Sequence, residues 1–260
     1  MSDALDVPGL LAALTAAARQ AATVILGHYH GRTAARTKAD HSPVTAAAEA
    51  AEALITPILE RLLPGVPVIA EEAAALHGLP SNEGYGERRF WLLDPLDGTK
   101  EFLSGNGEFT VNIALIEHGR PLLGVVGAPT LDTVYAGGPG GATVQHGDGA
   151  PKPIAARKQP AGGAIVLGSR SHGQGSDLDA FLAAQKVLEH RVAGSSLKFC
   201  QVAEGIADLY PRFGRTMEWD TAAGHAVLAA AGGHVETLDG RELGYGKPGF
   251  ENPHFVARGR

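Results

Sequence analysis

The sequence predicts a layered sandwich of the α/β or α+β class. Helix-rich and strand-rich segments alternate along the 260 residues without a regular βαβ rhythm, and no GxGxxG motif follows a first strand. A further observation is the stretch at residues 90–102, FWLLDPLDGTKEF, in which an apolar strand runs into a tight turn with two aspartates. We expect the other elements to be arranged around this stretch.

The chain begins with two predicted helices. Residues 5–29 place apolar side chains on one helical face. A second helix begins after Thr45, which is a good N-cap residue. Pro57 interrupts that helix and predicts a kink or a break, because proline removes a helical hydrogen bond.

Short strands dominate the middle of the chain. A strand at residues 67–70 ends in the glutamates at 71–72. Residues 73–89 lack periodicity and hold several Gly and Pro, which predicts a mobile surface loop over the site. Alternating or apolar runs predict further strands at residues 109–115, 122–126, 133–136 and 142–145.

A stretch rich in Gly and Pro, residues 137–160, is the expected boundary between two subdomains. We expect an N-terminal α+β subdomain at residues 1–157 and a C-terminal α/β subdomain at residues 158–260. In the second, strands are predicted at residues 164–167, 187–192 and 208–210, and helices at residues 177–184, 197–204 and 219–231.

The composition is that of a soluble globular protein without a nucleic-acid polymer as partner. The chain is 44% hydrophobic and 19% charged, and its net charge of −6 disfavours binding to a nucleic-acid backbone. A single cysteine excludes an internal disulfide and fits a reducing cytoplasm. The acidic start is unlike a signal peptide, and no uninterrupted apolar run is long enough for an integral membrane segment. We expect a cytoplasmic protein. The sequence leaves open whether it also contacts the inner membrane peripherally and whether it forms a homodimer.

The central stretch presents two carboxylates and backbone amides on one turn. Asp94 ends the strand, and Pro95 cannot continue it. Asp97 follows, and Gly98 permits a sharp turn, after which Thr99 is placed to cap a helical turn. Clustered carboxylates suit a hard cation, and free amides at a helix start suit a phosphate. An Asp-rich turn alone is also common in α/β proteins without such a site.

The full string DPLDGTKEF resembles the signature of the magnesium-dependent, lithium-sensitive phosphatases related to inositol monophosphatase. Its KEF ending is similar to the branch of 3′(2′),5′-bisphosphate nucleotidases. The resemblance extends from the SPVT segment at residues 42–45 to the end of the chain, and it implies an αβαβα sandwich of the inositol monophosphatase and fructose-1,6-bisphosphatase type. It also implies two or three Mg²⁺ ions that activate water and stabilise the leaving alkoxide, so Cys200 is expected to be structural.

The resemblance implies a set of metal ligands and a set of substrate contacts. The metal ligands are Glu71, Asp94, the carbonyl of Leu96, Asp97 and Asp220. The substrate contacts are Leu96, Asp97, Gly98, Thr99, Gly194, Ser195, Ser196, Lys198, Arg212 and Asp220. Without the resemblance, Asp220 would be interpreted as a helix N-cap. Carboxylates about 4 Å apart repel by roughly 4 kcal/mol per pair at an effective dielectric near 20, so a fold that gathers four of them needs cations.

The proton acceptor departs from the family pattern. The resemblance implies that Thr99 takes the proton of the attacking water and relays it to an aspartate after the string Val-Thr-x-x. Here VTAA is followed by Ala48, and Glu49 lies about 100° further round the helix. The activity is then lowered or lost, or Glu71 or Glu72 serves as the base.

The second phosphate of a bisphosphate nucleotide needs cationic donors away from the metals. Lys198 and Arg212, in the strings GSSLK and YPRFG, resemble the nucleotidase residues for this 5′-phosphate. By themselves they would be ordinary surface cations. Ser169, Arg170 and His172 are weaker candidates for nucleotide contacts.

These features predict a phosphatase that removes the 3′-phosphate of adenosine 3′,5′-bisphosphate and yields AMP. The substrate partner is a small bisphosphate nucleotide, and 3′-phosphoadenylyl sulfate is a second expected substrate, in sulfur assimilation. An inositol or sugar phosphatase on the same scaffold is the nearest alternative. Ala48 motivates an alternative from another class, a non-catalytic binder of the bisphosphate nucleotide.

Overall fold

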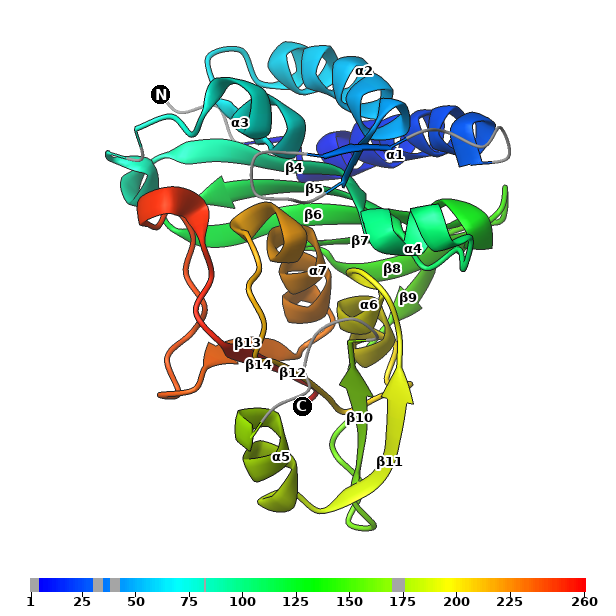
Figure 1. Cartoon of the computed structure of the whole chain (residues 1–260), viewed down its shortest axis with the longest axis vertical. Helices are drawn as coiled ribbons and strands as arrows, with labels where there is room; N and C mark the ends of the chain where they lie inside the picture. The colour runs from blue at the N-terminus through cyan, green and yellow to red at the C-terminus, as the bar shows by residue number, and fades with distance from the viewer. Residues whose placement is uncertain (1–4, 30–34, 38–42, 82, 170–175) are drawn as a thin grey trace.

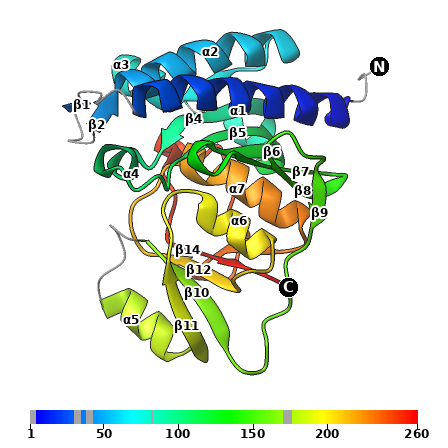
Figure 2. The same ribbon diagram turned by 90° about the vertical axis from the view of Figure 1, so that its right-hand side faces the viewer.

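Two β-sheets alternate with three layers of helices (Figure 1, Figure 2). The structure, a computed structural model, describes residues 5–29, 35–37, 43–81, 83–169 and 176–260. The successive layers are α1 (Val7–Tyr29) with α2 (Ala46–Leu62), a seven-stranded sheet, α6 (Leu197–Ala203) with α7 (Glu218–Ala230), a five-stranded sheet, and α5 (Ser176–Ala183). The predicted αβαβα sandwich is confirmed.

The seven-stranded sheet brings the two motif-bearing strands side by side. Its order is β3 (Val68–Ala70), β4 (Arg89–Asp97), β5 (Thr110–Glu117), β6 (Arg120–Ala128), β7 (Thr133–Gly138), β8 (Gly141–His146) and β9 (Lys152–Ile154). Only β3 and β4 are parallel among these neighbours, with Ala70 opposite Leu93. Their carboxyl ends therefore meet, and Glu71 follows one strand where Asp94 lies in the other.

The central strands are buried on both faces, which explains why their sequences are almost continuously apolar. In β4, Trp91 and Leu93 pack in the cluster that includes α1 and α2. Phe90 and Leu92 pack in the cluster that includes α6 and α7. Successive side chains of a strand point to opposite faces of the sheet. One apolar run therefore packs against the helices on both sides.

The amphipathic face predicted for α1 is confirmed. Leu10, Leu14, Ala17, Ala21 and Ile25 are buried, and they belong to the cluster on the large sheet. Among the described residues, α1 is also the one helix whose length and composition suit a membrane span, with a hydropathy of 1.5. It is therefore more apolar than the sequence analysis allowed, although its buried face packs as a core helix does.

The five-stranded sheet has the order β11 (Val187–Val192), β10 (Ala164–Gly168), β12 (Leu209–Arg212), β14 (Phe255–Arg258) and β13 (His234–Thr237). β10 is parallel to both of its neighbours, and β14 is antiparallel to both of its own. Phe181 and Leu182 of α5 pack on this sheet against Val166 and Val256. The subdomain boundary at residues 157 and 158 stays a prediction.

Several short elements complete the described chain. They are β1 (Ala35–Thr37) paired with β2 (Pro43–Thr45), the helices α3 (Glu71–His77) and α4 (Thr99–Ser104), and the 3₁₀ turns η1 (Tyr85–Glu87), η2 (Pro129–Leu131) and η3 (Pro248–Phe250). The predicted N-cap of α2 is confirmed, because the Thr45 hydroxyl accepts a hydrogen bond from the Ala48 amide at 3.2 Å.

Of the kink or break predicted at Pro57, the break is wrong, since α2 continues through this residue as one helix. The kink stays a prediction. The buried face of α2, with Ala51, Ile55 and Leu59, packs against α1 and the large sheet. Tertiary packing of this kind supplies most of a helix's stability, and it offsets the hydrogen bond that proline removes.

The loop predicted at residues 73–89 is also wrong in part, because α3 occupies its beginning and η1 lies near its end. The buried carboxylate of Glu52 accepts hydrogen bonds from the amides of Glu72 and Ala73, each at 2.8 Å. These are two of the amides that a helix start leaves without internal partners. Glu52 thus fixes the start of α3 and with it the position of Glu71.

Candidate active site

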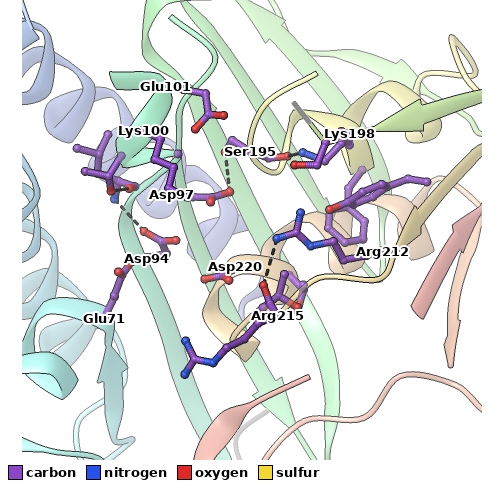
Figure 3. Close-up of a pocket in the computed structure, with 18 residues that line it drawn as sticks. Glu71, Asp94, Asp97, Lys100, Glu101, Ser195, Lys198, Arg212, Arg215 and Asp220 are labelled. Carbon is purple, nitrogen blue, oxygen red and sulfur yellow. Dashed lines mark hydrogen bonds between the residues drawn. The ribbon is translucent and has the colours of Figure 1, made fainter. Parts of the chain in front are cut away.

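A cavity of about 240 Å³ lies where the ends of β3 and β4 meet the starts of α4 and α7 and the loop before α6 (Figure 3). Most of the predicted site residues line it. They are Glu71, Asp94, Leu96, Asp97, Gly98, Thr99, Ser169, Ser195, Lys198, Arg212 and Asp220. Glu72, Gly194 and Ser196 are not part of its wall. Arg170 and His172 fall outside the described residues.

Three carboxylates form the acidic centre of the cavity. Glu71, Asp94 and Asp220 each offer an oxygen within 4.8 Å of the others. Burial and the neighbouring negative charges raise the pKa of both Asp94 and Asp220 well above the usual value. Arg212 offsets part of the charge at Asp220, but burial and the neighbouring carboxylates outweigh it. Clustered carboxylate oxygens are the donor set that a hard divalent cation prefers. The three residues therefore fit a metal ion.

Asp97 lies beside this centre and is held by the loop before α6. Its Oδ2 accepts hydrogen bonds from the Ser195 hydroxyl at 2.6 Å and from the Ser196 amide at 2.8 Å. The Asn112 side chain approaches the same oxygen at 3.4 Å. The charge of Asp97 contributes to the raised pKa of Asp94 and of Asp220. It thus belongs to the same electrostatic centre, although it is not one of the three closest carboxylates.

A buried polar network connects that loop to the large sheet. Asn112, fully buried on β5, donates to the Ser196 hydroxyl at 3.0 Å and accepts from the Thr110 hydroxyl at 3.0 Å. The Thr110 and Ser195 hydroxyls are hydrogen-bonded to each other. The Ser196 hydroxyl donates in turn to the carbonyl of Asp220 at 2.7 Å. Ser196 therefore positions acidic residues from behind the cavity wall.

Asp220 is not the N-cap of α7, which corrects the simpler interpretation of this residue. Met217 takes the cap position, and Asp220 lies in the first turn. Its Oδ2 accepts a hydrogen bond from the Met217 amide at 2.8 Å. The side chain thus satisfies an amide at the helix start while it lines the cavity.

Two cations predicted for the second phosphate lie on the far wall of the cavity, and neither is an ordinary surface residue. Lys198 is buried and donates to the carbonyls of Ala193 at 3.1 Å and Ser195 at 2.6 Å. Burial lowers the pKa of Lys198 to about 8. Arg212 is 9% exposed, and its Nε has no hydrogen-bond partner within the described parts of the chain. A buried guanidinium with an unused donor is suited to an anion.

The candidates for proton transfer are only partly assembled. The Thr99 hydroxyl donates a hydrogen bond to the carbonyl of Leu96 at 3.3 Å. The residue predicted to take the proton of the attacking water therefore contacts a predicted metal ligand. Ala48 is buried and carries no acidic group, whereas Glu49 is exposed. Glu72 lies outside the cavity wall, although Glu71 lines it. Glu49 therefore faces away from the buried side of α2, as predicted, and does not replace an acid at position 48.

Two glycines let the turns of the site approach each other. Gly98 has φ of +90°, a conformation that favours glycine. A Cβ on Gly194 would lie 2.5 Å from the carbonyl oxygen of Glu108. The close approach of these backbones explains why a glycine is needed at position 194.

Several residues of the cavity wall were not predicted from the sequence to have a role. They are Lys100, Glu101, Phe199, Tyr210, Arg215, Thr216 and Thr221. Lys100 and Glu101 stand within the DPLDGTKEF string itself, and the others lie within four residues of Lys198, Arg212 or Asp220. Their nearness in the sequence to predicted site residues could have indicated that they line the cavity.

Comparison with known proteins identifies the family to which this chain belongs. The sequence profile described as "Inositol monophosphatase family" matches residues 7–257. A curated relative, the 3′(2′),5′-bisphosphate nucleotidase CysQ of Escherichia coli strain K12, is 50% identical over 222 residues, covering 84% of this chain and 86% of that protein. CysQ of Salmonella typhimurium is 47% identical over 243 residues, with 92% and 95% covered.

Solved structures agree with this comparison. CysQ from Bacteroides thetaiotaomicron has a TM-score of 0.82 and 35% identity, and the match covers 98% of this chain and 99% of that one. An inositol monophosphatase from Anabaena has a TM-score of 0.75 and 27% identity, with 97% and 91% covered.

Proposed function

We propose, from the premise that this chain belongs to the inositol monophosphatase family, that it hydrolyses the 3′-phosphate of adenosine 3′,5′-bisphosphate. The single observation that carries this proposal is that one cavity holds both an acidic centre and two buried cations, Lys198 and Arg212. A substrate with two phosphates suits such a cavity, because one group needs metal ions and the other needs cationic donors. 3′-Phosphoadenylyl sulfate, of similar charge, is proposed as a second substrate, in sulfur metabolism of the cytoplasm.

The proposed cofactor is Mg²⁺, with two or three ions. Glu71, Asp94 and Asp220 would hold it, and Asp97 and the carbonyl of Leu96 lie on the same wall. Mg²⁺ bound by such oxygen donors supplies positive charge that activates water and offsets the charge of the leaving group.

The protein's own residues are proposed to orient the reactants. Arg212 donates to the second phosphate through the Nε that no residue of the described chain occupies. The Thr99 hydroxyl, on the cavity wall, is the candidate for contact with the attacking water. No side-chain nucleophile is needed. Cys200 is fully buried, and burial raises the pKa of its thiol well above the ordinary value, which suits the predicted structural role.

A second candidate function is favoured by one observation. Position 48 holds a buried alanine, so the described part of the cavity offers Thr99 no aspartate there as a proton acceptor. A chain with an intact acidic centre and no proton acceptor would bind the bisphosphate without turning it over. An inositol or sugar phosphatase has less support, because the curated relatives of 50% and 47% identity carry the nucleotidase name.

Phosphate release tests the proposal directly. The purified chain is incubated with adenosine 3′,5′-bisphosphate, AMP or inositol monophosphate, each with Mg²⁺ and with EDTA. We expect phosphate and AMP from the bisphosphate alone, no release with EDTA, and recovery when Mg²⁺ is added. Asp94→Asn should lose activity, and Asp148→Asn, at an exposed aspartate away from the cavity, is the matched control.

The other outcomes separate the candidates. Release from inositol monophosphate alone would support a sugar or inositol phosphatase instead. Mg²⁺-dependent binding of the bisphosphate, measured by calorimetry without phosphate release over hours, would support the non-catalytic binder.

A further inference from the structure

Glu101 is a buried carboxylate of the cavity wall that the proposed function does not use. Its side chain is 9% exposed, and it lines the cavity from α4. No hydrogen bond reaches its carboxylate from the described part of the chain, whereas Oδ2 of Asp97 has three donors. Figure 3 shows its carboxylate beside Ser195 and above Asp97. This carboxylate has no donor from the described protein and opens onto the cavity, so a partner can be supplied from there.

Glu101 lies close to the turn that follows Asp97 and to the loop before α6. Its Oε2 lies 3.4 Å from where a Cβ on Gly98 would stand, and Gly98 directly follows Asp97. Its Cγ lies 3.0 Å from the corresponding point on Gly194, in the loop that Lys198 holds. The negative charge of Glu101 also raises the pKa of Lys198, against the larger effect of burial. The carboxylate therefore stands beside Asp97 and beside the loop that holds Lys198.

The chemistry of a carboxylate restricts what the partner is. An ionised carboxylate accepts hydrogen bonds and repels phosphate, so the part of the substrate beside it carries hydroxyl or amine donors. Lys198 does not serve as this donor, because its ammonium donates to the carbonyls of Ala193 and Ser195. In adenosine 3′,5′-bisphosphate, the donor adjacent to the phosphate that is removed is the ribose 2′-hydroxyl.

We propose that Glu101 is a specificity-determining residue that accepts a hydrogen bond from the sugar hydroxyl next to the scissile phosphate. This inference rests on the proposed function. The enzyme then distinguishes ribose from deoxyribose at the carbon beside the reaction. A hydrogen bond to a charged group corresponds to a preference of roughly 10- to 100-fold in kcat/KM.

The test compares two substrates that differ by one oxygen atom. Adenosine 3′,5′-bisphosphate and its 2′-deoxy analogue are assayed with the wild-type chain, Glu101→Gln and Glu101→Ala. We expect the wild type to prefer the ribose substrate, Glu101→Ala to lose that preference through slower ribose turnover alone, and Glu101→Gln to fall between them. The Gln variant is nearly isosteric, and circular dichroism with thermal unfolding confirms that each variant is folded.

Glu108→Gln is the matched control, because the Glu108 charge also acts on Lys198 but Glu108 does not line the cavity. It should keep the wild-type preference. Equal losses on both substrates, shared by Glu101→Ala and Glu108→Gln, would show that Glu101 acts only through Lys198 and would overturn the inference. A preference that survives Glu101→Ala would overturn it as well.

The remaining outcomes separate this inference from the proposed function. The inosine 3′,5′-bisphosphate analogue lacks the adenine amine, and if Glu101→Ala removes discrimination against this base rather than against deoxyribose, the assignment to the sugar is overturned. A wild-type chain that cleaves both sugars equally well keeps the proposed function and overturns the role of Glu101. A wild-type chain that neither binds nor cleaves either bisphosphate overturns both.

Discussion

The backbone amide of Ser196 donates a 2.8 Å hydrogen bond to Oδ2 of Asp97, a residue 99 positions earlier in the chain. The hydroxyl of the same serine donates to the carbonyl of Asp220 at 2.7 Å. One buried residue of the second half therefore positions acidic residues from both halves. The loop before α6 is part of the acidic centre's support as well as of the cavity wall.

Ser196→Ala should weaken both the fold and the site. It leaves the carbonyl of Asp220 and the side-chain amide of Asn112 without their present hydroxyl partner. Each buried group left unsatisfied costs about 1–3 kcal/mol, so we expect the free energy of unfolding to fall by roughly that amount, with a lower kcat/KM. Urea unfolding and phosphate release measure the two effects. Ser81→Ala, at an exposed serine, should change neither.

Gly194→Ala should displace the same loop. The added Cβ would lie 2.5 Å from the carbonyl oxygen of Glu108, a backbone atom just before β5. Overpacking of this kind costs typically about 1–3 kcal/mol, and we expect slower phosphate release because Ser195 and Ser196 move away from Asp97.

A second glycine gives the matched control for that variant. Gly27 lies in α1 with no atom within 4 Å of an added Cβ. Gly27→Ala should raise the unfolding free energy by about 0.5–1 kcal/mol and leave phosphate release unchanged. A Gly194→Ala chain as stable and active as the wild type would contradict the steric argument.

The sequence predicted most of the architecture because its central strands are long and apolar and its first helix is strongly amphipathic. Strands with weaker patterns were missed, including β13 and β14, which are four residues long. The short helix α3 was missed because its seven residues carry no buried side chain, so no apolar periodicity marked it. Its start depends on Glu52, a contact from another helix that local sequence does not reveal.

The candidate site was predictable where a residue type is required by chemistry and less so where it is required by packing. The acidic residues and both cations line one cavity, as their motifs indicated. Ser196 and Gly194 were assigned to substrate, yet they lie outside the cavity wall and support it. Asn112 received no role, because a single buried amide in an alternating strand resembles any other polar residue.

Arg212→Gln should weaken binding of the second phosphate selectively. The variant removes a buried charge with an unused donor, and a charged hydrogen bond of about 1.5–3 kcal/mol corresponds to roughly a 10- to 100-fold rise in KM for adenosine 3′,5′-bisphosphate. Adenosine 3′-monophosphate, which lacks the 5′-phosphate, should be cleaved with little change. Arg241→Gln, at an exposed ion pair with Asp239, is the control.

Lys198 provides an informative contrast to Arg212. Its ammonium donates to two carbonyls of the loop before α6, so Lys198→Met should slow the cleavage of adenosine 3′,5′-bisphosphate and of adenosine 3′-monophosphate together. If preference for the bisphosphate survived in the Arg212→Gln and Lys198→Met double variant, the assignment of the second phosphate site would be wrong.

His225 should make the fold less stable in mild acid. Burial lowers its pKa to about 3, and its Nδ1 is hydrogen-bonded to the Tyr245 hydroxyl at 3.0 Å. Below about pH 6.5 the unfolded chain binds a proton at this histidine and the folded chain does not, so this contribution to stability is complete above pH 6.5 and is lost as the pH falls. From pH 7 to pH 5 the loss is about 2 kcal/mol.

Urea unfolding at the two pH values measures this linkage in the wild type and in His225→Gln. The variant has no group to protonate at this position, so its unfolding free energy should fall by about 2 kcal/mol less than that of the wild type. An identical pH dependence in both chains would mean that His225 is protonated in the folded state or does not control acid stability.

Ala48→Asp should raise the rate of phosphate release. Ala48 lies in the first turn of α2 and is buried, and an acidic side chain there would supply a proton acceptor of the kind that general-base catalysis needs. General bases contribute about 10²- to 10⁴-fold, so a gain of that order in kcat is expected if proton transfer limits the present chain. Glu49→Gln, at the exposed neighbour, should have no effect. Equal rates in the Ala48→Asp and wild-type chains would show that another group already takes the proton, and Glu71 would then be the first residue to test.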